Sequence, residues 1–268
     1  MDHHLIQSKK VKRLIKEGRG KGEGKDYTPW TKTYSLEFSS KGRVTRTMGV
    51  KTGRIHYLQS DNQYRAFLNF EFSKSVTDIR ESYPLLDVYE VVNKLDDLRF
   101  DKFQDRETKE PYVLTTNFLL TTLVHGETKL LARTIKNQSE LNRKITLEKL
   151  EIERRYWQAK NIDWKVITNK QLSKQRAKNL EWLRETLLED QFQNTKENLA
   201  DSLLQFLIEN RTHPINTILS KFDQIETLNE GTALYLFRFL IASGKVELDL
   251  DSPINIKLSF KDMFGMEV

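Results

Sequence analysis

The sequence contains no cysteine, and it has only five prolines in 268 residues. Without thiols the chain has neither a disulfide framework nor a thiolate metal site. No apolar run reaches the about 18 residues that a membrane-spanning helix needs. The N-terminal residues MDHHLIQSKK lack the apolar core of a secretion signal. We therefore expect a cytoplasmic protein that makes no contact with a membrane.

The composition is that of a globular protein, with 38% hydrophobic and 31% charged residues. A chain of 268 residues is long enough for two domains, each with its own core. The formal net charge of +6 favours a polyanionic partner, although many basic proteins bind none.

The stretch TLEKLEIERRYW, residues 146–157, predicts an amphipathic helix. Its apolar residues recur about one helical turn apart, and its charged residues form pairs three and four positions apart. An apolar run ending at Lys136 precedes the helix, and the run WKVIT, residues 164–168, follows it. The helix is therefore expected to connect two strands of one sheet.

The rest of the N-terminal part predicts further strands and helices. Ser60 and Gln63 form a capping-box pattern at the start of a helix. Strands are expected at 75–80, 113–120 and 129–136, a hairpin from 32–38 and 43–48, and a helix at 173–188. Residues 87–110 are rich in charge of both signs and predict an insertion or loop. This order is typical of an α/β fold with a mixed sheet flanked by helices, as in a nuclease core.

A polar run after Glu189 suggests a boundary between a domain of residues 1–189 and one of residues 190–268. Helices are expected at 196–209, 215–222 and 229–242, followed by alternating strands at 246–250 and 254–258. Three helices and a terminal hairpin form the order of a winged-helix domain, which binds DNA or protein. Arg238 is the only cation between Asn229 and Ser243, so we favour a protein partner for this domain.

A basic arm, residues 7–25, opens the first domain and alternates cations with glycines. The glycines would keep its backbone pliable, and its cations could follow a phosphate backbone. A solvated tail remains the alternative. The candidate DNA-binding residues are Lys9, Lys10, Lys12, Arg13, Lys16, Arg19, Lys21 and Lys25.

The segments IKEGRGKGEGKDYTPW, KTGRIHYLQSD, SVTDIRESYPLL and TLEKLEIERRYW, in this order and spacing, resemble the TnsA endonuclease subunit of heteromeric transposases. The resemblance spans about residues 11–183 and is weaker beyond them. It implies a restriction-endonuclease-like first domain and a winged-helix-like second domain. It also implies Mg²⁺-dependent cutting of the 5′ ends of transposon-end DNA, together with a TnsB-type DDE transposase and a TnsC-type ATPase regulator.

The family's site has a Glu on a helix, an Asp on a strand, and a polar residue and a Lys on the next strand. By this resemblance the four positions fall on Gln63, Asn117, Thr134 and Lys136, the first three being the metal ligands for Mg²⁺ or, alternatively, Mn²⁺. Only the lysine matches the pattern outright. An amide is a much weaker ligand than a carboxylate and cannot take a proton, so cleavage should fall on the order of a thousandfold or more.

Each of these residues also has an ordinary local interpretation. Gln63 fits a helix cap, Asn117 and Thr134 fit strand positions, and Lys136 fits a solvated strand end. The amides fit natural loss of activity or deliberate substitution, and Asp61, Glu71 or Glu81 are conceivable replacement acids. A non-catalytic DNA-bridging adaptor and a stand-alone restriction-like nuclease are the competing functions.

Overall fold

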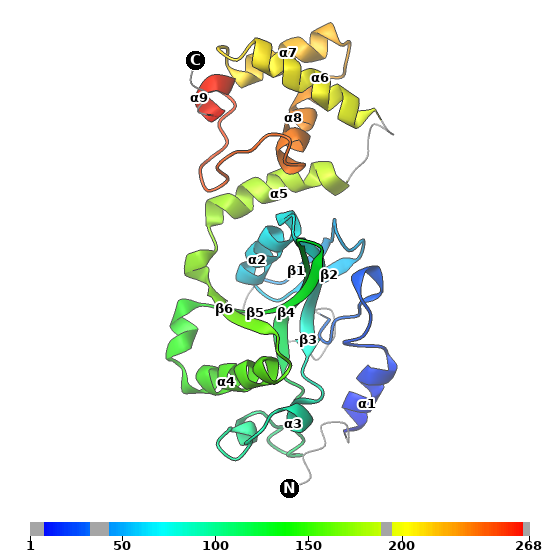
Figure 1. Ribbon diagram of the computed structural model, residues 1–268, viewed down its shortest axis with the longest axis vertical. Coiled ribbons are helices and arrows are strands. Elements are labelled where there is room, and N and C mark those ends of the chain that lie inside the picture. Colours follow the sequence, from blue (N-terminus) through cyan, green and yellow to red (C-terminus); the bar gives the residue numbers. More distant parts are fainter. Residues whose placement is uncertain (1–7, 33–42, 189–194, 265–268) are drawn as a thin grey trace. The chain divides into compact units, whose positions relative to one another are not determined.

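The computed structural model describes residues 8–32, 43–188 and 195–264 (Figure 1). The chain divides into two units, Met1–Leu172 and Ser173–Val268. No helix in these described ranges combines the length and apolar composition needed to cross a membrane.

The first unit holds helices α1 to α4 and all of the named strands. The helices are α1 Lys9–Lys16, α2 Asp61–Phe72, α3 Val88–Val91 and α4 Lys144–Ala159, with 3-10 turns η2 Gly24–Asp26, η3 Phe100–Lys102, η4 Gln138–Asn142 and η5 Asn169–Gln171. The strands are β1 Thr45–Met48, β2 Ile55–Leu58, β3 Val76–Pro84, β4 Thr115–Val124, β5 Glu127–Lys136 and β6 Asp163–Thr168.

Four strands form the central sheet in the order β3-β4-β5-β6. β4 runs antiparallel to both β3 and β5, whereas β6 runs parallel to β5. A parallel neighbour needs a crossover connection, and α4 provides it. The predictions of a mixed sheet and of a helix joining two of its strands are confirmed.

The helices α2 and α4 lie on opposite sides of this sheet (Figure 1). On the α2 side, Phe70 contacts Phe118 of β4 with ring centroids 5.3 Å apart. On the α4 side, Ile152, Tyr156 and Trp157 belong to a buried cluster that includes residues of β4 and β5. Both faces of the sheet are therefore covered, which is the layered arrangement of a restriction-endonuclease-like fold.

Ser82 interrupts the regular alternation of side chains along β3. Its φ of 49° lies in the left-handed region, which is unusual for a residue other than glycine. Glu81 bonds to Arg54 and His56, whereas the ring of Tyr83 packs against Trp157 of α4. Residues two apart on a strand normally share a face, so the turn at Ser82 sends these two side chains to different neighbours.

The segment 87–110, predicted as an insertion or loop, is partly built into the core. It begins with the short helix α3 and supplies the buried residues Val88, Val92 and Leu98 to the cluster around Trp157. Because charged residues interrupt its apolar residues, the sequence of this segment shows no periodic pattern that would predict a contribution to the core.

The predicted hairpin from 32–38 and 43–48 is only partly described, because residues 33–42 lie outside the described part of the chain. Its second strand corresponds to β1. This strand pairs antiparallel with β2, from Thr45 opposite Leu58 to Met48 opposite Ile55. The sequence did not predict β2 or this pairing.

The second unit consists of α5 Lys174–Leu188, α6 Lys196–Glu209, α7 Ile215–Ile225, α8 Thr232–Ala242 and α9 Phe260–Phe264. The three helices predicted after Glu189 correspond to α6, α7 and α8. α5 belongs with them, because Nε of Arg238 in α8 donates to the carbonyl of Trp182 in α5 at 2.9 Å. The division between units therefore falls at Leu172, ahead of α5, rather than after Glu189.

The two strands predicted at 246–250 and 254–258 are not formed, and the winged-helix interpretation is not confirmed. The backbone of this segment bonds to helices instead. The side chain of Asn179 donates to the carbonyls of Leu250 and Ser252, and the first amides of α7 donate to those of Ile256 and Leu258. These carbonyls are thus satisfied without a sheet.

Candidate functional site

The four site positions predicted by resemblance lie on three elements of the first unit. Gln63 is in the first turn of α2, Asn117 is in β4, and Thr134 and Lys136 are at the end of β5. The start of α2 lies against the end of β5, where Nδ2 of Asn62 donates to Oδ1 of Asn137 at 2.8 Å. The fold thus brings segments far apart in sequence to one edge of the sheet.

Ser60 caps α2 as the sequence predicted, but the Gln63 side chain bonds one residue earlier than a capping box requires. The backbone N–H of Gln63 donates to Oγ of Ser60 at 3.2 Å, and its Oε1 accepts from the N–H of Gln59 at 2.9 Å. The side chain is therefore held at the head of α2 by the backbone that precedes it.

Asn117 is held in the same way by the neighbouring strand. Its Oδ1 accepts from the backbone N–H of Ile135 at 2.7 Å. Since Ile135 stands between Thr134 and Lys136, this bond places the Asn117 amide directly beside the two predicted residues of β5.

Thr134 is almost fully buried and bonds toward α4. Its Oγ1 donates to Oε2 of Glu153 at 2.5 Å and accepts from Nε1 of Trp164 at 3.0 Å. Oγ1 of Thr116 donates to the same Glu153 oxygen at 2.9 Å. These bonds leave the Thr134 hydroxyl poorly placed to serve as a metal ligand.

Lys136 is more enclosed than a solvated strand end. Its side chain is 20% exposed, and Oε1 of Glu140 lies 3.9 Å from Nζ. Burial lowers the pKa of Lys136, the nearby charge of Lys149 lowers it further, and Glu140 and Glu153 oppose the shift. The positive charge of Lys149 is therefore close enough to act on the ammonium group of Lys136.

The sequence reasoning did not single out Glu153 and Lys149, which stand one helical turn apart on α4. Nζ of Lys149 lies 3.4 Å from Oε1 of Glu153 and donates to the carbonyl of Thr115 at 2.9 Å. Glu153 is 0% exposed. A signal was present in the sequence: Glu153 lies three positions from both Leu150 and Tyr156, on the buried side of the helix.

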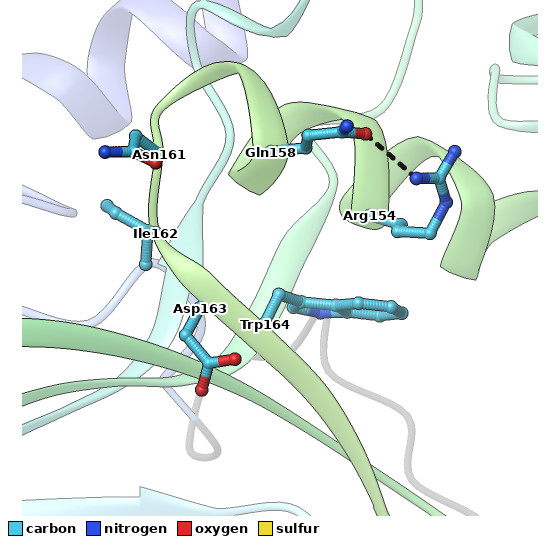
Figure 2. A pocket seen from close by; sticks show the side chains of 6 residues that line it. All are labelled: Arg154, Gln158, Asn161, Ile162, Asp163 and Trp164. Carbon is cyan, nitrogen blue, oxygen red and sulfur yellow. Dashed lines mark hydrogen bonds between the residues drawn. The ribbon is translucent and has the colours of Figure 1, made fainter.

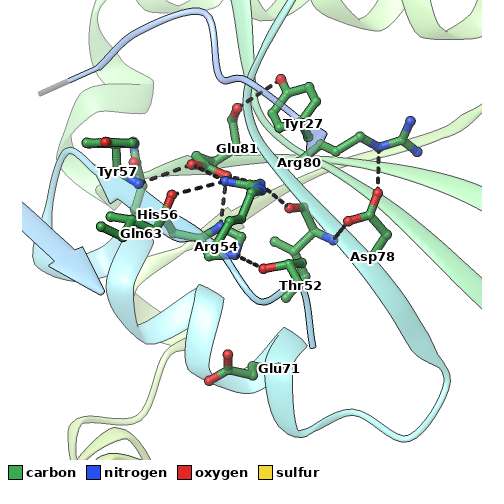
Figure 3. A network of polar contacts seen from close by, with 12 residues as sticks. Tyr27, Thr52, Arg54, His56, Tyr57, Gln63, Glu71, Asp78, Arg80 and Glu81 are labelled. Atoms are coloured by element: carbon green, nitrogen blue, oxygen red, sulfur yellow. Dashed lines mark hydrogen bonds and ion pairs between the residues drawn. The ribbon is translucent and has the colours of Figure 1, made fainter. Parts of the chain in front are cut away.

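Two of the three acids considered as replacements, Glu71 and Glu81, are engaged elsewhere (Figure 3), whereas Asp61 is exposed in the first turn of α2. Glu81 accepts two bonds from Arg54 and one from His56, and its carboxylate also accepts from the N–H of Tyr57 at 3.1 Å. Burial opposes ionisation of Glu81, but His56 and Arg54 lower its pKa to about 2. Glu71 accepts from the N–H of Val50 at 2.6 Å. Neither carboxylate is available to serve as a ligand beside Gln63 and Asn117.

The residues at the four positions do not fit a divalent cation well. The oxygens of Gln63, Asn117 and Thr134 are each committed to a bond within the protein, and none carries a charge. Within the described residues, no group of three His, Cys, Asp or Glu side chains could hold a metal ion. Mg²⁺ prefers carboxylate oxygens in a near-octahedral arrangement, which this set does not offer.

A hollow of about 500 Å³ lies at the junction of α4 and β6, separate from these four residues (Figure 2). It is lined by Arg154, Gln158, Asn161, Ile162, Asp163 and Trp164. Arg154 is bonded to Glu151 and Gln158, and Asp163 is bonded to Arg133. Its charged side chains are thus paired inside the protein.

The basic arm is more ordered than the sequence suggested. Val11 and Leu14 of α1 pack with Trp30, and the glycines that follow adopt fixed left-handed conformations. At Gly20 an added Cβ would lie 2.3 Å from Cγ of Pro84, so this glycine permits a close approach. The prediction that the glycines keep this segment pliable is therefore wrong for residues 18–24.

Most of the predicted DNA-binding cations lie on the exposed surface of the arm: Lys9, Lys10, Lys12, Arg13, Lys16, Lys21 and Lys25. Arg19 differs, because its guanidinium bonds to Glu17 and to the carbonyl of Trp30 at 3.1 Å. Arg19 thus fixes the arm to the domain.

Comparisons with known proteins place the chain in a family. The family model described as "TnsA-like endonuclease N terminal" matches residues 73–169, and "TnsA endonuclease C terminal" matches residues 171–250. The first match contains Asn117, Thr134 and Lys136, whereas Gln63 precedes it. "Transposon Tn7 transposition protein TnsA" of Escherichia coli is 35% identical over 248 residues, covering 90% of this chain and 85% of that protein. On these matches and on its sheet flanked by helices, this chain belongs to the TnsA endonuclease family.

Proposed function

We propose that this protein acts at transposon ends as a TnsA-type subunit whose own cutting of the 5′ strand is severely weakened. The observation that carries the proposal is the pair of amides at 63 and 117. Each is neutral, and each has its oxygen bound to a backbone N–H.

The expected chemistry explains why these two residues decide activity. Endonucleases of this kind are expected to use a divalent metal, which would polarise the scissile phosphate and lower the pKa of an attacking water. Carboxylates at positions 63 and 117 would hold that ion, and Lys136 would offset charge on the phosphate. With amides in their place, we expect cleavage to fall by on the order of a thousandfold or more.

The proposed partners follow from the family and from the relative's name. A protein of Tn7 transposition works with DNA and with other transposition proteins, so we infer a DDE transposase and an ATPase regulator as partners here. The second unit is the proposed contact region for these proteins. Its one cation in α8, Arg238, bonds to Trp182 and Glu185 of α5, which leaves α8 poorly equipped to read DNA.

Reverting the amides tests the proposal. The chain and a Gln63→Glu/Asn117→Asp variant would be incubated with the transposase, the regulator, a transposon-end duplex and Mg²⁺ or Mn²⁺. We expect 5′-strand cuts from the variant and few or none from the unaltered chain. Gln138→Glu is a matched control, because it adds an exposed carboxylate just beyond the end of β5 without restoring the site.

Two outcomes would contradict the proposal in different ways. If the unaltered chain cuts the 5′ strand as fast as the Gln63→Glu/Asn117→Asp variant, its cleavage is not weakened. Failure of the double reversion to cut, in a complex that still assembles on DNA, would favour the second candidate, a non-catalytic DNA-bridging adaptor. The adaptor is supported by Thr134, whose hydroxyl is committed to Glu153 and would remain so after the reversion.

A further inference from the structure

The hydrogen bonds of the two amides fix which way their polar atoms point. A backbone N–H can only donate, so the atoms that accept from Gln59 and Ile135 must be the amide oxygens of Gln63 and Asn117. The amide nitrogens are then left for other partners, and neither is among the buried unpaired atoms of the described residues. At each position, an amide NH₂ group, which donates, thus stands where a carboxylate would have a second oxygen, which accepts.

Lys136 adds a cation at the end of β5, next in sequence to Ile135, whose N–H holds the Asn117 oxygen. In the described part of the chain its Nζ has no hydrogen bond, and its ion pair with Glu140 is long, at 3.9 Å. Oε2 of Glu140 accepts from the N–H of Asn137 at 2.7 Å, so this carboxylate is occupied by the turn that it caps. The ammonium group of Lys136 therefore retains donors for a ligand.

The charges around the site are already balanced without a metal ion. Lys136 and Lys149 face two carboxylates, Glu140 and Glu153, at 3.9 and 3.4 Å. Glu153 is buried and accepts from two threonine hydroxyls. In the described part of the chain no third carboxylate is paired with these two lysines, and a site lined by donors suits an anion.

We propose that this edge of the sheet is a metal-independent binding site for a DNA backbone phosphate. The amide nitrogens of Gln63 and Asn117 and the ammonium of Lys136 donate to the phosphate oxygens, and Lys149 adds charge behind them. This proposal rests on the proposed function, because it takes the DNA end to be present at the same site. In a cutting enzyme, a metal ion held by two acids would bind this phosphate. Here the side chains of Gln63 and Asn117 bind it instead.

Binding of a transposon-end duplex to the full chain in EDTA tests the proposal. We expect Lys136→Gln to weaken binding by on the order of tenfold and to lower the slope of log K against log salt by about 0.9. Lys136→Arg should retain most of the binding. Lys129→Gln is the matched control, since Lys129 stands on the same strand and its side chain is 60% exposed. Unchanged melting temperatures would show that the variants fold.

DNA binding by the Gln63→Glu/Asn117→Asp variant provides a second test. Gln63→Glu/Asn117→Asp should bind DNA more weakly than the unaltered chain in EDTA and recover on addition of Ca²⁺, which supplies charge without supporting cleavage. The DNA affinity of the unaltered chain should change little on addition of Ca²⁺. Equal binding by Lys136→Gln and Lys129→Gln, or a strong Ca²⁺ response of the unaltered chain, would overturn the phosphate site. Weakened cleavage would stand in either case, because it is measured separately by strand cutting.

Discussion

Glu81→Gln should reveal a buried electrostatic contribution to the stability of the first unit. Glu81 is 1% exposed, and Arg54 and His56 bond to its carboxylate (Figure 3). Its pKa falls from 4.5 to about 2 despite burial, because these two partners favour the charged form. A depression of this size corresponds to about 3 kcal/mol of folding free energy above pH 5.

The sign of the pH dependence follows from this lowered pKa. The contribution is complete above the unfolded value of 4.5 and is lost as the pH falls toward 2. The variant keeps the shape of Glu81 but leaves Arg54 without a charged partner, so we expect a loss of about 3 kcal/mol at pH 7. At pH 3.5 the difference between the two proteins should be about 1 kcal/mol smaller, because Glu81 takes up a proton in the unfolded chain, where its pKa is 4.5, while it stays ionised in the folded protein.

Urea unfolding followed by tryptophan fluorescence measures this difference. Trp30, Trp157 and Trp164 lie in the first unit, so the signal reports mainly on it. Glu127→Gln is the control, because Glu127 is 71% exposed and pairs with an exposed lysine, an arrangement that contributes little. Equal losses in both variants, or a Glu81→Gln effect that stays constant from pH 7 to 3.5, would refute the reasoning.

Three further predictions concern other parts of the chain. Gly20→Ala should destabilise the first unit by about 1–3 kcal/mol more than Gly53→Ala. Both glycines have a positive φ, but only at Gly20 would an added Cβ clash with Pro84. Urea unfolding of the two variants measures the difference in their free energies of unfolding. Asn179→Ala should speed hydrogen exchange at 249–252 and cost about 1–3 kcal/mol, since it removes two partly buried bonds to the carbonyls of Leu250 and Ser252; unchanged exchange would argue against that role. Replacing the exposed lysines of α1 with Gln should lower the slope of log K against log salt for DNA binding by about 0.9 per phosphate contact. Arg19→Ala should instead lower the melting temperature, because Arg19 bonds to the carbonyl of Trp30. Identical effects of the two changes would contradict these separate roles in DNA binding and in stability.

Elements with a strong periodic pattern were predictable from the sequence. The helix at 146–157, the strands on either side of it and the cap at Ser60 are all found close to their expected positions. Each of these signals is local, since the side-chain pattern along a helix or strand reflects the face that it buries. The charged segment 87–110 gave no such pattern, and its apolar residues gained their place only from contact with α4.

The predicted strands at 246–250 and 254–258 show the limit of local patterns. Their alternating residues suit a hairpin, but their carbonyls bond to Asn179 and to the start of α7. A strand forms only where a neighbouring strand satisfies its backbone groups, and here helices satisfy them first.

The sequence by itself determined the family of this protein and its mixed sheet, because residue identity and spacing are sufficient for these. Only the tertiary structure decided which atoms the side chains of Gln63, Asn117 and Thr134 contact. It directs both amide oxygens to backbone N–H groups, commits Thr134 to the buried Glu153, and pairs Lys149 with the same Glu153. Apart from the local bond of Gln63, these contacts join residues of β4, β5 and α4, and no local pattern in the chain specifies which of their atoms will meet.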